Sequence, residues 1–242
     1  MKKKVVTAII TIASLYLVIC ILLFLFQEKL LFFPERLPED FKFSFPMSFE
    51  EINYQVADGV KINTVLFHAA KGEKVVMYLH GNGGSIYGWG TGAETYLRNG
   101  YDVLYIDYRG YGKSGGKIES EKQLIADAQL IYDDLKAKYS ESNITLIGTS
   151  IGSGIAVQIA ASNNPERLIL NAPYASLKQL IREKVPIVPG VILKYRLESK
   201  KYIKEVECPI YIFHGKNDEV IPYRHAVSLK ETDDRVQLTL ID

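Results

Sequence analysis

The sequence predicts an α/β domain built on a mainly parallel sheet with helices on both faces, joined to one N-terminal membrane-spanning helix. Three observations predict this fold class. Short apolar strands alternate with helical segments from about residue 50 onward, a pattern typical of parallel sheets that are buried on both faces. An uncharged apolar run precedes them. The 242 residues, 48% of them hydrophobic, suit one large domain plus an extra segment.

The apolar run covers residues 5–26, VVTAIITIASLYLVICILLFLF. As a helix rising about 1.5 Å per residue it would reach about 33 Å, enough to cross the hydrocarbon core. A cleaved signal peptide has a shorter apolar core and an Ala-x-Ala-like cleavage site, which is not found here. LVIC resembles a lipoprotein processing site, but Ile19 is too bulky before Cys20. We therefore expect an uncleaved single-pass anchor.

The positive-inside bias is expected to keep Lys2, Lys3 and Lys4 in the cytoplasm and to place the rest of the chain on the extracytoplasmic side. The chain is thus divided into a cytoplasmic segment at residues 1–4, the anchor at 5–26, a linker at 27–48 and the α/β domain at 49–242.

Eight strands are expected along the domain. The first two should pair antiparallel, because Asp58 and Gly59 between them favour a tight hairpin turn. The strands are expected at residues 50–59, 60–69, 74–81, 101–110, 143–150, 167–173, 209–215 and 235–242. Helices are expected at residues 93–98, 120–139, 154–162 and 223–231, the second being amphipathic.

The composition excludes several classes of function. The 29 basic and 28 acidic side chains are mixed along the chain and leave a net charge of +1, so no nucleic acid partner is implied. Two cysteines, Cys20 and Cys208, make no disulfide framework and are both interpreted as small buried apolar residues. No cluster of histidines and cysteines has metal-ligand spacing, so neither a metal nor a cofactor is implied.

The motif GTSIG, residues 148–152, lies between an apolar strand and a helix. A G-x-S-x-G sequence in this context is typical of a sharp turn that presents a serine hydroxyl above the sheet. Gly148 and Gly152 would leave room for neighbouring backbone. The positive end of the following helix would lie near the hydroxyl of Ser150. We interpret Ser150 as a nucleophile rather than as a helix cap.

The motif HGNGG, residues 80–84, follows the strand VVMYL. A serine nucleophile forms a tetrahedral oxyanion that needs preorganised N–H donors. The glycine-rich loop at Gly81 can supply one donor, and the residue after the nucleophile can supply the other. We assign these donors to the backbone N–H groups of Asn82 and Ile151. His80 is interpreted as a structural residue that holds the loop.

The motif HGKNDEVIP, residues 214–222, follows a late strand. A base histidine needs an acid that orients it and stabilises its charged form. Asp218 lies on this loop and comes after the serine in the chain, which is the order this type of site uses. We interpret Asp218 as the acid, Glu219 as its competitor and His214 as a structural residue.

These motifs, together with DYRGYGKSGG at residues 107–116, resemble the α/β-hydrolase superfamily. The nearest resemblance is to membrane-anchored α/β-hydrolase domain proteins of the bud-emergence type, which are allied to serine-aminopeptidase-like hydrolases. FFPE at residues 32–35 fits the same family. The resemblance covers almost the whole chain and implies the α/β-hydrolase fold, a Ser–Asp–His triad and acyl-transfer hydrolysis. It implies a loop-shaping role for residues 107–116 and leaves the substrate open.

The triad histidine is expected on a loop after the last strand. The chain has four histidines, His68, His80, His214 and His225, and the last of these alone follows Asp218. Three interpretations remain. The sequence is a fragment whose base histidine lies beyond Asp242; the protein is an inactive hydrolase kept for binding or scaffolding; or His225 or His80 acts as a substitute base. We favour the first.

Residues 174–207 are longer and more irregular than the other connections and are broken by Pro186 and Pro189. This segment is the expected lid over an acyl pocket. Its apolar stretch VPIVPGVIL is compatible with an acyl group, with nearby lipid and with plain packing. The expected partners are therefore a small-molecule or lipid acyl substrate and, through the N-terminal helix, a membrane.

Overall fold

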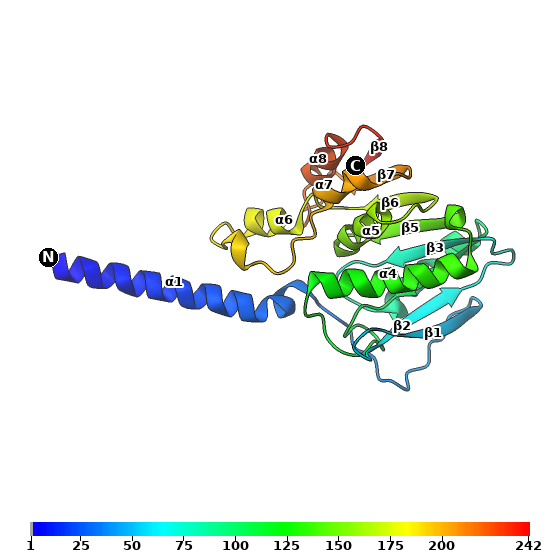
Figure 1. Ribbon diagram of the computed structural model, residues 1–242, viewed down its shortest axis with the longest axis horizontal. Helices are drawn as coiled ribbons and strands as arrows, with labels where there is room; N and C mark the ends of the chain where they lie inside the picture. The colour runs from blue at the N-terminus through cyan, green and yellow to red at the C-terminus, as the bar shows by residue number, and fades with distance from the viewer. Residues whose placement is uncertain (1) are drawn as a thin grey trace.

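The computed structural model describes residues 2–242, so Met1 of the predicted segment 1–4 lies outside the described residues. Helix α1, Lys2–Leu31, projects from an α/β domain and is long and apolar enough to cross a membrane (Figure 1). It is longer than the predicted anchor, because Gln27 and Glu28 continue the helix. The chain leaves helical geometry just before Pro34, as residues that precede proline commonly do.

The domain contains one eight-stranded sheet in the order β1-β2-β4-β3-β5-β6-β7-β8. Strand β2 is antiparallel to both β1 and β4, and every other neighbouring pair is parallel. The predicted mainly parallel sheet is therefore confirmed. The strands are β1 Phe49–Gln55, β2 Lys61–Phe67, β3 Lys74–Leu79, β4 Tyr101–Ile106, β5 Ile144–Thr149, β6 Arg167–Asn171, β7 Ile210–Gly215 and β8 Val236–Ile241.

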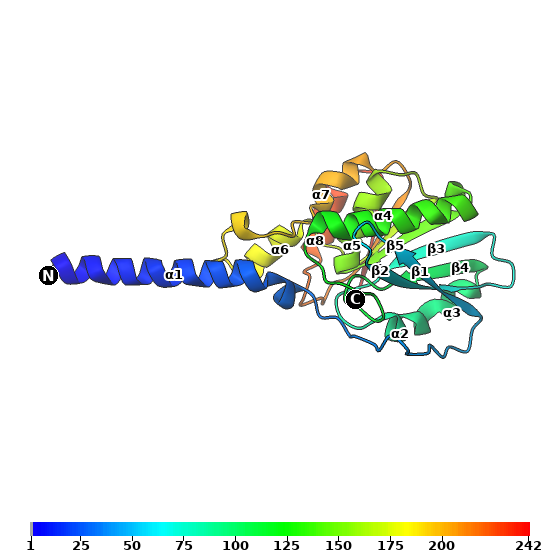
Figure 2. The ribbon, with the colours of Figure 1, turned by 60° about the horizontal axis from the view of Figure 1, so that its bottom comes forward.

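Helices cover both faces of the sheet. Helices α4, α5 and α7 lie on one face, and α2 and α3 lie on the other (Figure 2). Helix α4 begins with Ser120, whose side chain accepts a hydrogen bond from the N–H of Gln123 as an N-cap. The helices after α1 are α2 Ile86–Trp89, α3 Ala93–Leu97, α4 Glu121–Lys138, α5 Ile151–Ala161, α6 Leu177–Lys184, α7 Ser199–Tyr202 and α8 Arg224–Lys230.

The linker between α1 and β1 is pinned along the domain surface. Its backbone forms short parallel bridges from Pro34 to Gly84 and from Arg36 to Gly112. Further along, the Phe45 ring packs edge-to-face on Phe67 of β2, with centroids 4.9 Å apart. These contacts fix where the N-terminal helix meets the domain.

The loop after β4 is braced by a buried ion pair. Arg109 is 4% exposed, and its guanidinium donates two hydrogen bonds to the Asp127 carboxylate of α4, of 2.6 and 3.0 Å. A bidentate pair of this kind also fixes the geometry of its loop. This contact gives Arg109 a bracing role in the loop.

Candidate active site

Ser150 occupies the sharp turn between β5 and α5. Its φ of 51° and ψ of −118° lie in a region that non-glycine residues rarely adopt. The turn is held on both sides: the Ser150 N–H donates to the carbonyl of Asn171 at 2.9 Å, and the Ser150 carbonyl accepts from the Ser153 hydroxyl at 2.6 Å. The local fold thus imposes strain on the one residue whose hydroxyl the sequence singles out.

Two glycines permit this turn, because neighbouring backbone atoms lie where a side chain would otherwise begin. A Cβ built on Gly148 would lie 2.7 Å from the carbonyl oxygen of Gly152, and one on Gly152 would overlap the carbonyl oxygen of Leu79. Leu79 ends strand β3, so Gly152 lets the first turn of α5 approach the end of that strand. The glycines predicted at both ends of GTSIG therefore have a steric basis.

The HGNGG loop lies against the serine. A Cβ built on Gly81 would be 3.6 Å from the Ser150 Cβ. Within residues 2–242, neither the backbone N–H of Asn82 nor that of Ile151 donates a hydrogen bond to another residue. The Ile151 N–H opens helix α5, where unsatisfied donors and the helix dipole favour negative charge. Both groups are therefore available to an oxyanion beside Ser150.

The side chain of Asn82 is tied to the end of the N-terminal helix. Its Oδ1 accepts hydrogen bonds from the Phe33 N–H at 3.1 Å and the Tyr111 hydroxyl at 2.9 Å. Its Nδ2 donates to the carbonyl of Leu31, the last residue of α1. Glu35 adds further links, because its N–H donates to the Gly84 carbonyl at 3.1 Å and its carboxylate accepts from the Ser85 hydroxyl at 2.7 Å. The FFPE segment and the HGNGG loop thus form one hydrogen-bonded unit.

His80 lies inside the domain beneath this loop and is fully buried. Its Nδ1 is 2.7 Å from the Gly81 carbonyl oxygen, and its Nε2 is 3.5 Å from Oδ1 of Asp107. The other carboxylate oxygen of Asp107 has no hydrogen-bond partner within residues 2–242, and burial raises the pKa of Asp107. The His80 carbonyl accepts a hydrogen bond from the Tyr108 hydroxyl at 2.9 Å, so His80 links the glycine-rich loop to the segment that follows β4.

Asp218 lies on the loop between β7 and α8. Its Oδ1 accepts hydrogen bonds from the N–H groups of Val220 at 2.9 Å and Ile221 at 2.8 Å, and its Oδ2 is 3.6 Å from Nε2 of His214. The carboxylate is therefore held by its own loop. The next residue, Glu219, lines the same cavity as Ser150.

The His225 ring is engaged by Ala175 and Glu183 rather than by the serine. The ring is buried in α8, where its Nδ1 accepts from the Ala175 N–H at 3.4 Å and its Nε2 is 3.2 Å from the Glu183 carboxylate. Burial lowers the pKa of His225, although Glu183 opposes this effect. Within residues 2–242, no hydrogen bond joins a histidine to the Ser150 hydroxyl.

A cavity of about 580 Å³ opens beside Ser150. This volume is within the usual range for a small-molecule site. Its walls are mainly apolar and come from α1, from α6 and from the loop that follows α6. The lining includes Leu23, Gln27, Leu30, Leu31, Asn82, Ser150, Ile151, Tyr174, Leu177, Leu180, Ile181, Lys184, Val185, Val188, Ile192, Leu193, Glu219, Val220 and Ile221.

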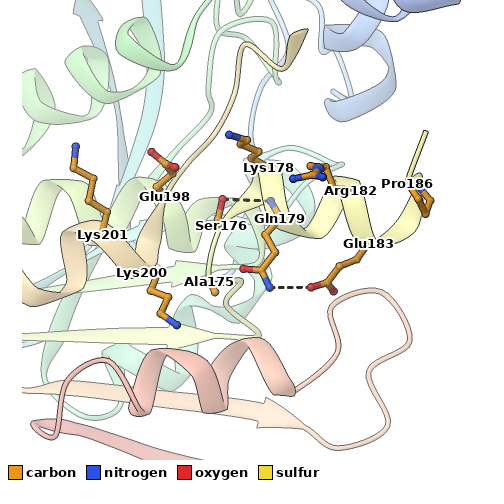
Figure 3. A pocket seen from close by; sticks show the side chains of 10 residues that line it. All are labelled: Ala175, Ser176, Lys178, Gln179, Arg182, Glu183, Pro186, Glu198, Lys200 and Lys201. Atoms are coloured by element: carbon orange, nitrogen blue, oxygen red, sulfur yellow. Dashed lines mark hydrogen bonds between the residues drawn. The ribbon is translucent and has the colours of Figure 1, made fainter. Parts of the chain in front are cut away.

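Helix α6 separates this cavity from a polar groove. Leu177, Leu180 and Ile181 face the cavity, whereas Lys178 and Arg182 face the groove. Figure 3 shows the groove, with charged side chains from α6 and from the start of α7 around it. The amphipathic pattern of α6 thus assigns its apolar side to the cavity beside the candidate nucleophile.

The fold and the strained serine turn define an α/β-hydrolase. The structure is similar to that of an esterase of Pyrococcus furiosus, with a TM-score of 0.68, 19% identity and coverage of 88% of both chains. Residues 70–200, more than half of the chain, match the family model of serine aminopeptidases S33. The chain belongs to this family, as the motifs predicted.

Two relatives extend the comparison. A putative alpha/beta hydrolase of Acanthamoeba polyphaga mimivirus is 32% identical over 168 residues, which are 66% of this chain and 61% of that protein. The lysophosphatidylserine lipase ABHD12 of Macaca fascicularis is 29% identical over 181 residues, 64% of this chain and 44% of that lipase. The chain thus spans about half the length of these relatives, and together with the family match they support a hydrolase.

The predicted site residues fall into two groups. Asn82, Ser150 and Ile151 line one cavity, and Asp218 lies beside it on the loop that carries Glu219. The sequence does not indicate that α1 contributes to the site, because its pattern predicts only an anchor and the start of a linker there. Gln27, a polar residue at the end of an apolar run, was the available signal: it is only 4% exposed and lines the cavity.

Proposed function

We propose that the chain is a membrane-anchored serine hydrolase that cleaves an ester, thioester or amide through an acyl-enzyme on Ser150. One observation carries the proposal: the strained Ser150 lies in an apolar cavity beside two free backbone donors, the N–H groups of Asn82 and Ile151. This arrangement suits a nucleophile and the oxyanion that it generates.

The reaction would proceed in two halves. The Ser150 oxygen attacks the carbonyl carbon and passes its proton to a base, while the two N–H groups stabilise the negative oxygen. The leaving group departs with that proton. Water then passes a proton to the base and attacks the acyl-enzyme; the acid departs, and the proton is returned to the Ser150 oxygen. Asp218 is proposed to orient the base histidine and to stabilise its charged form.

The substrate class follows from the cavity and the relatives. Apolar walls from α1 and α6 favour a lipid or another acyl compound. A lysophosphatidylserine lipase among the relatives and an esterase among similar structures agree with this class. Residues 174–207 are proposed as the lid, because α6 and the following loop form one side of the cavity.

The proposed location is a membrane. Helix α1 is long and apolar enough to span the bilayer. The three lysines at its start favour an extracytoplasmic catalytic domain. Protease protection of the domain in sealed inside-out vesicles, and its digestion in intact spheroplasts, would support this orientation.

The test of the proposed function uses a fluorophosphonate probe on membranes containing the protein expressed from its gene. Such probes phosphonylate activated serines, so we expect a covalent adduct on the peptide containing Ser150, found by mass spectrometry. Prior incubation with a long-chain ester should slow labelling. Absence of any adduct on Ser150 would contradict the proposal and favour the alternative of a binding or scaffolding protein.

Replacing Asn82 with alanine should lower kcat for a soluble ester by about tenfold, because the loop that carries an oxyanion donor loses its three side-chain contacts. KM should change less, since the apolar walls remain. The matched control is Asn99→Ala, whose side chain bonds only the Thr95 carbonyl of an exposed helix. An unchanged kcat in Asn82→Ala would rule out this positioning role.

A further inference from the structure

One face of α1 is fastened to the loop that follows α6. The Tyr16 hydroxyl donates to the carbonyl of Ile187 at 2.9 Å. Eleven residues further along α1, the Gln27 side chain donates to the carbonyl of Ile192 at 3.1 Å and accepts from the Lys194 N–H at 2.9 Å. These anchoring points on α1 are about 16 Å apart along its axis. The loop therefore runs beside the helix, as Figures 1 and 2 show.

The same loop exposes apolar side chains. Ile187 is 63% exposed and Val191 is 82% exposed, next to the exposed apolar surface of α1. Tyr16 lies ten residues inside the apolar run that ends at Phe26, which corresponds to about 15 Å along the helix. A bilayer that surrounds α1 would therefore also surround the tip of this loop.

Part of the loop backbone is paired or lacks a donor, which lowers the cost of contact with an apolar solvent, in which each unpaired polar group is costly; the N–H groups of Ile187, Gly190 and Val191 have no partner within residues 2–242. Pro186 and Pro189 have no N–H group. The N–H groups of Val188 and Ile192 donate within the loop, each at 3.1 Å. The carbonyl of Ile187 accepts its hydrogen bond from the Tyr16 hydroxyl.

The catalytic cavity lies between this loop and α1. Its walls include Leu23 and Leu30 of α1, Ile181 of α6, and Val188 and Ile192 of the loop. Apolar side chains of both α1 and the loop therefore line the cavity that contains Ser150. On the polar side of α6, Lys178 and Arg182 are positioned near the base of the loop (Figure 3), where they suit lipid phosphates.

We infer that residues 185–193 insert beside α1 into the leaflet of the bilayer that is nearer to the α/β domain. The acyl chain of a membrane-resident ester enters the cavity sideways from this leaflet. This inference rests on the proposed function, a serine hydrolase anchored by α1. It makes the lipid leaflet the source of the substrate, so the acyl chain reaches Ser150 without crossing water. A water-soluble ester would reach the serine without this route.

The depth of the loop can be measured without any activity. Cys20 and Cys208 are first replaced by alanine, and Val191→Cys is labelled with the environment-sensitive fluorophore NBD. In phosphatidylcholine vesicles the fluorophore should emit at shorter wavelength and be quenched by lipids that carry a doxyl group on the acyl chain. Thr95→Cys, exposed on α3 of the domain, is the control and should show neither effect. Equal spectra and equal quenching at the two positions would overturn the inference.

The route of the substrate is tested with Val191→Glu, whose side chain does not line the cavity. A charge is costly in hydrocarbon, so hydrolysis of a long-chain ester in vesicles should fall about tenfold, whereas hydrolysis of soluble p-nitrophenyl butyrate should not change. Val191→Leu should match the unmodified protein on both. No fall for the vesicle ester, or an equal fall for both esters, would contradict the sideways route.

Ser150→Ala separates this inference from the proposed function. If Ser150→Ala retains full activity on both esters, the proposed nucleophile is wrong, and the NBD measurement still decides whether the loop is inserted. If Ser150→Ala is inactive but the Val191 probe stays in water, the hydrolase proposal stands and the inserted loop is rejected.

Discussion

Ser150→Ala is expected to lower ester hydrolysis by about 10⁴-fold or more. The hydroxyl oxygen is the proposed attacking atom, and what would remain after its loss is binding and oxyanion stabilisation alone. The turn should persist, because its hydrogen bonds use the backbone of residue 150 rather than its hydroxyl. Measurements of kcat/KM on a soluble ester and of fluorophosphonate labelling check both consequences.

The matched control for this change is Ser162→Ala, an exposed serine at the other end of the same helix that makes no side-chain cap. It should keep the activity of the unmodified protein. Thermal unfolding should be similar for both variants. A Ser150→Ala protein that hydrolyses the ester at half the normal rate would show that another group performs the attack.

Gly152→Ala is expected to prevent normal folding of the serine turn. The new methyl group would overlap the carbonyl oxygen of Leu79 and lie 2.6 Å from that of His80, and neither backbone atom can rotate away. Helix α5 would have to move off the end of β3. Overpacking of this kind costs about 3 kcal/mol, which corresponds to a Tm lower by about 10 °C in a domain of this size.

Gly88→Ala provides the comparison for this prediction. Gly88 also lies within a helix, α2, but a Cβ built on it meets nothing within 4 Å. Alanine there should leave Tm unchanged or raise it slightly, because it favours helical backbone. Equal melting curves for the two variants would mean that the approach of α5 to β3 is looser than the structure indicates.

The serine turn was predictable because its determinants are local. An apolar strand, two glycines around a serine and an apolar helix lie within residues 143–162, and this context matters more than the pattern alone. The eight strands and their mainly parallel pairing were likewise predicted from short apolar segments that alternate with helices, and the structure confirms them. Such periodic patterns carry the strongest signal in a single sequence.

The cavity wall was not predictable in this way. Leu31 and Asn82 are 51 residues apart in the chain, and no local pattern indicates that they share a hydrogen bond. The apolar residues of α1 were fully accounted for by a membrane, so nothing indicated that one side of the helix faces a cavity. The side chain of Gln27 is only 4% exposed, and its burial is explained by its hydrogen bonds to the backbone of Ile192 and Lys194, which the sequence alone does not indicate.

The attachment of α1 to the site has a practical consequence for handling the protein. A shortened form beginning after Leu31 would dissolve more readily, but it would lack Leu23, Leu30 and Leu31 from the cavity wall and the carbonyl that accepts from Asn82. Its kinetic constants would then describe an opened cavity. Inhibitor screens and substrate profiling are therefore better performed on the intact protein in detergent micelles or nanodiscs.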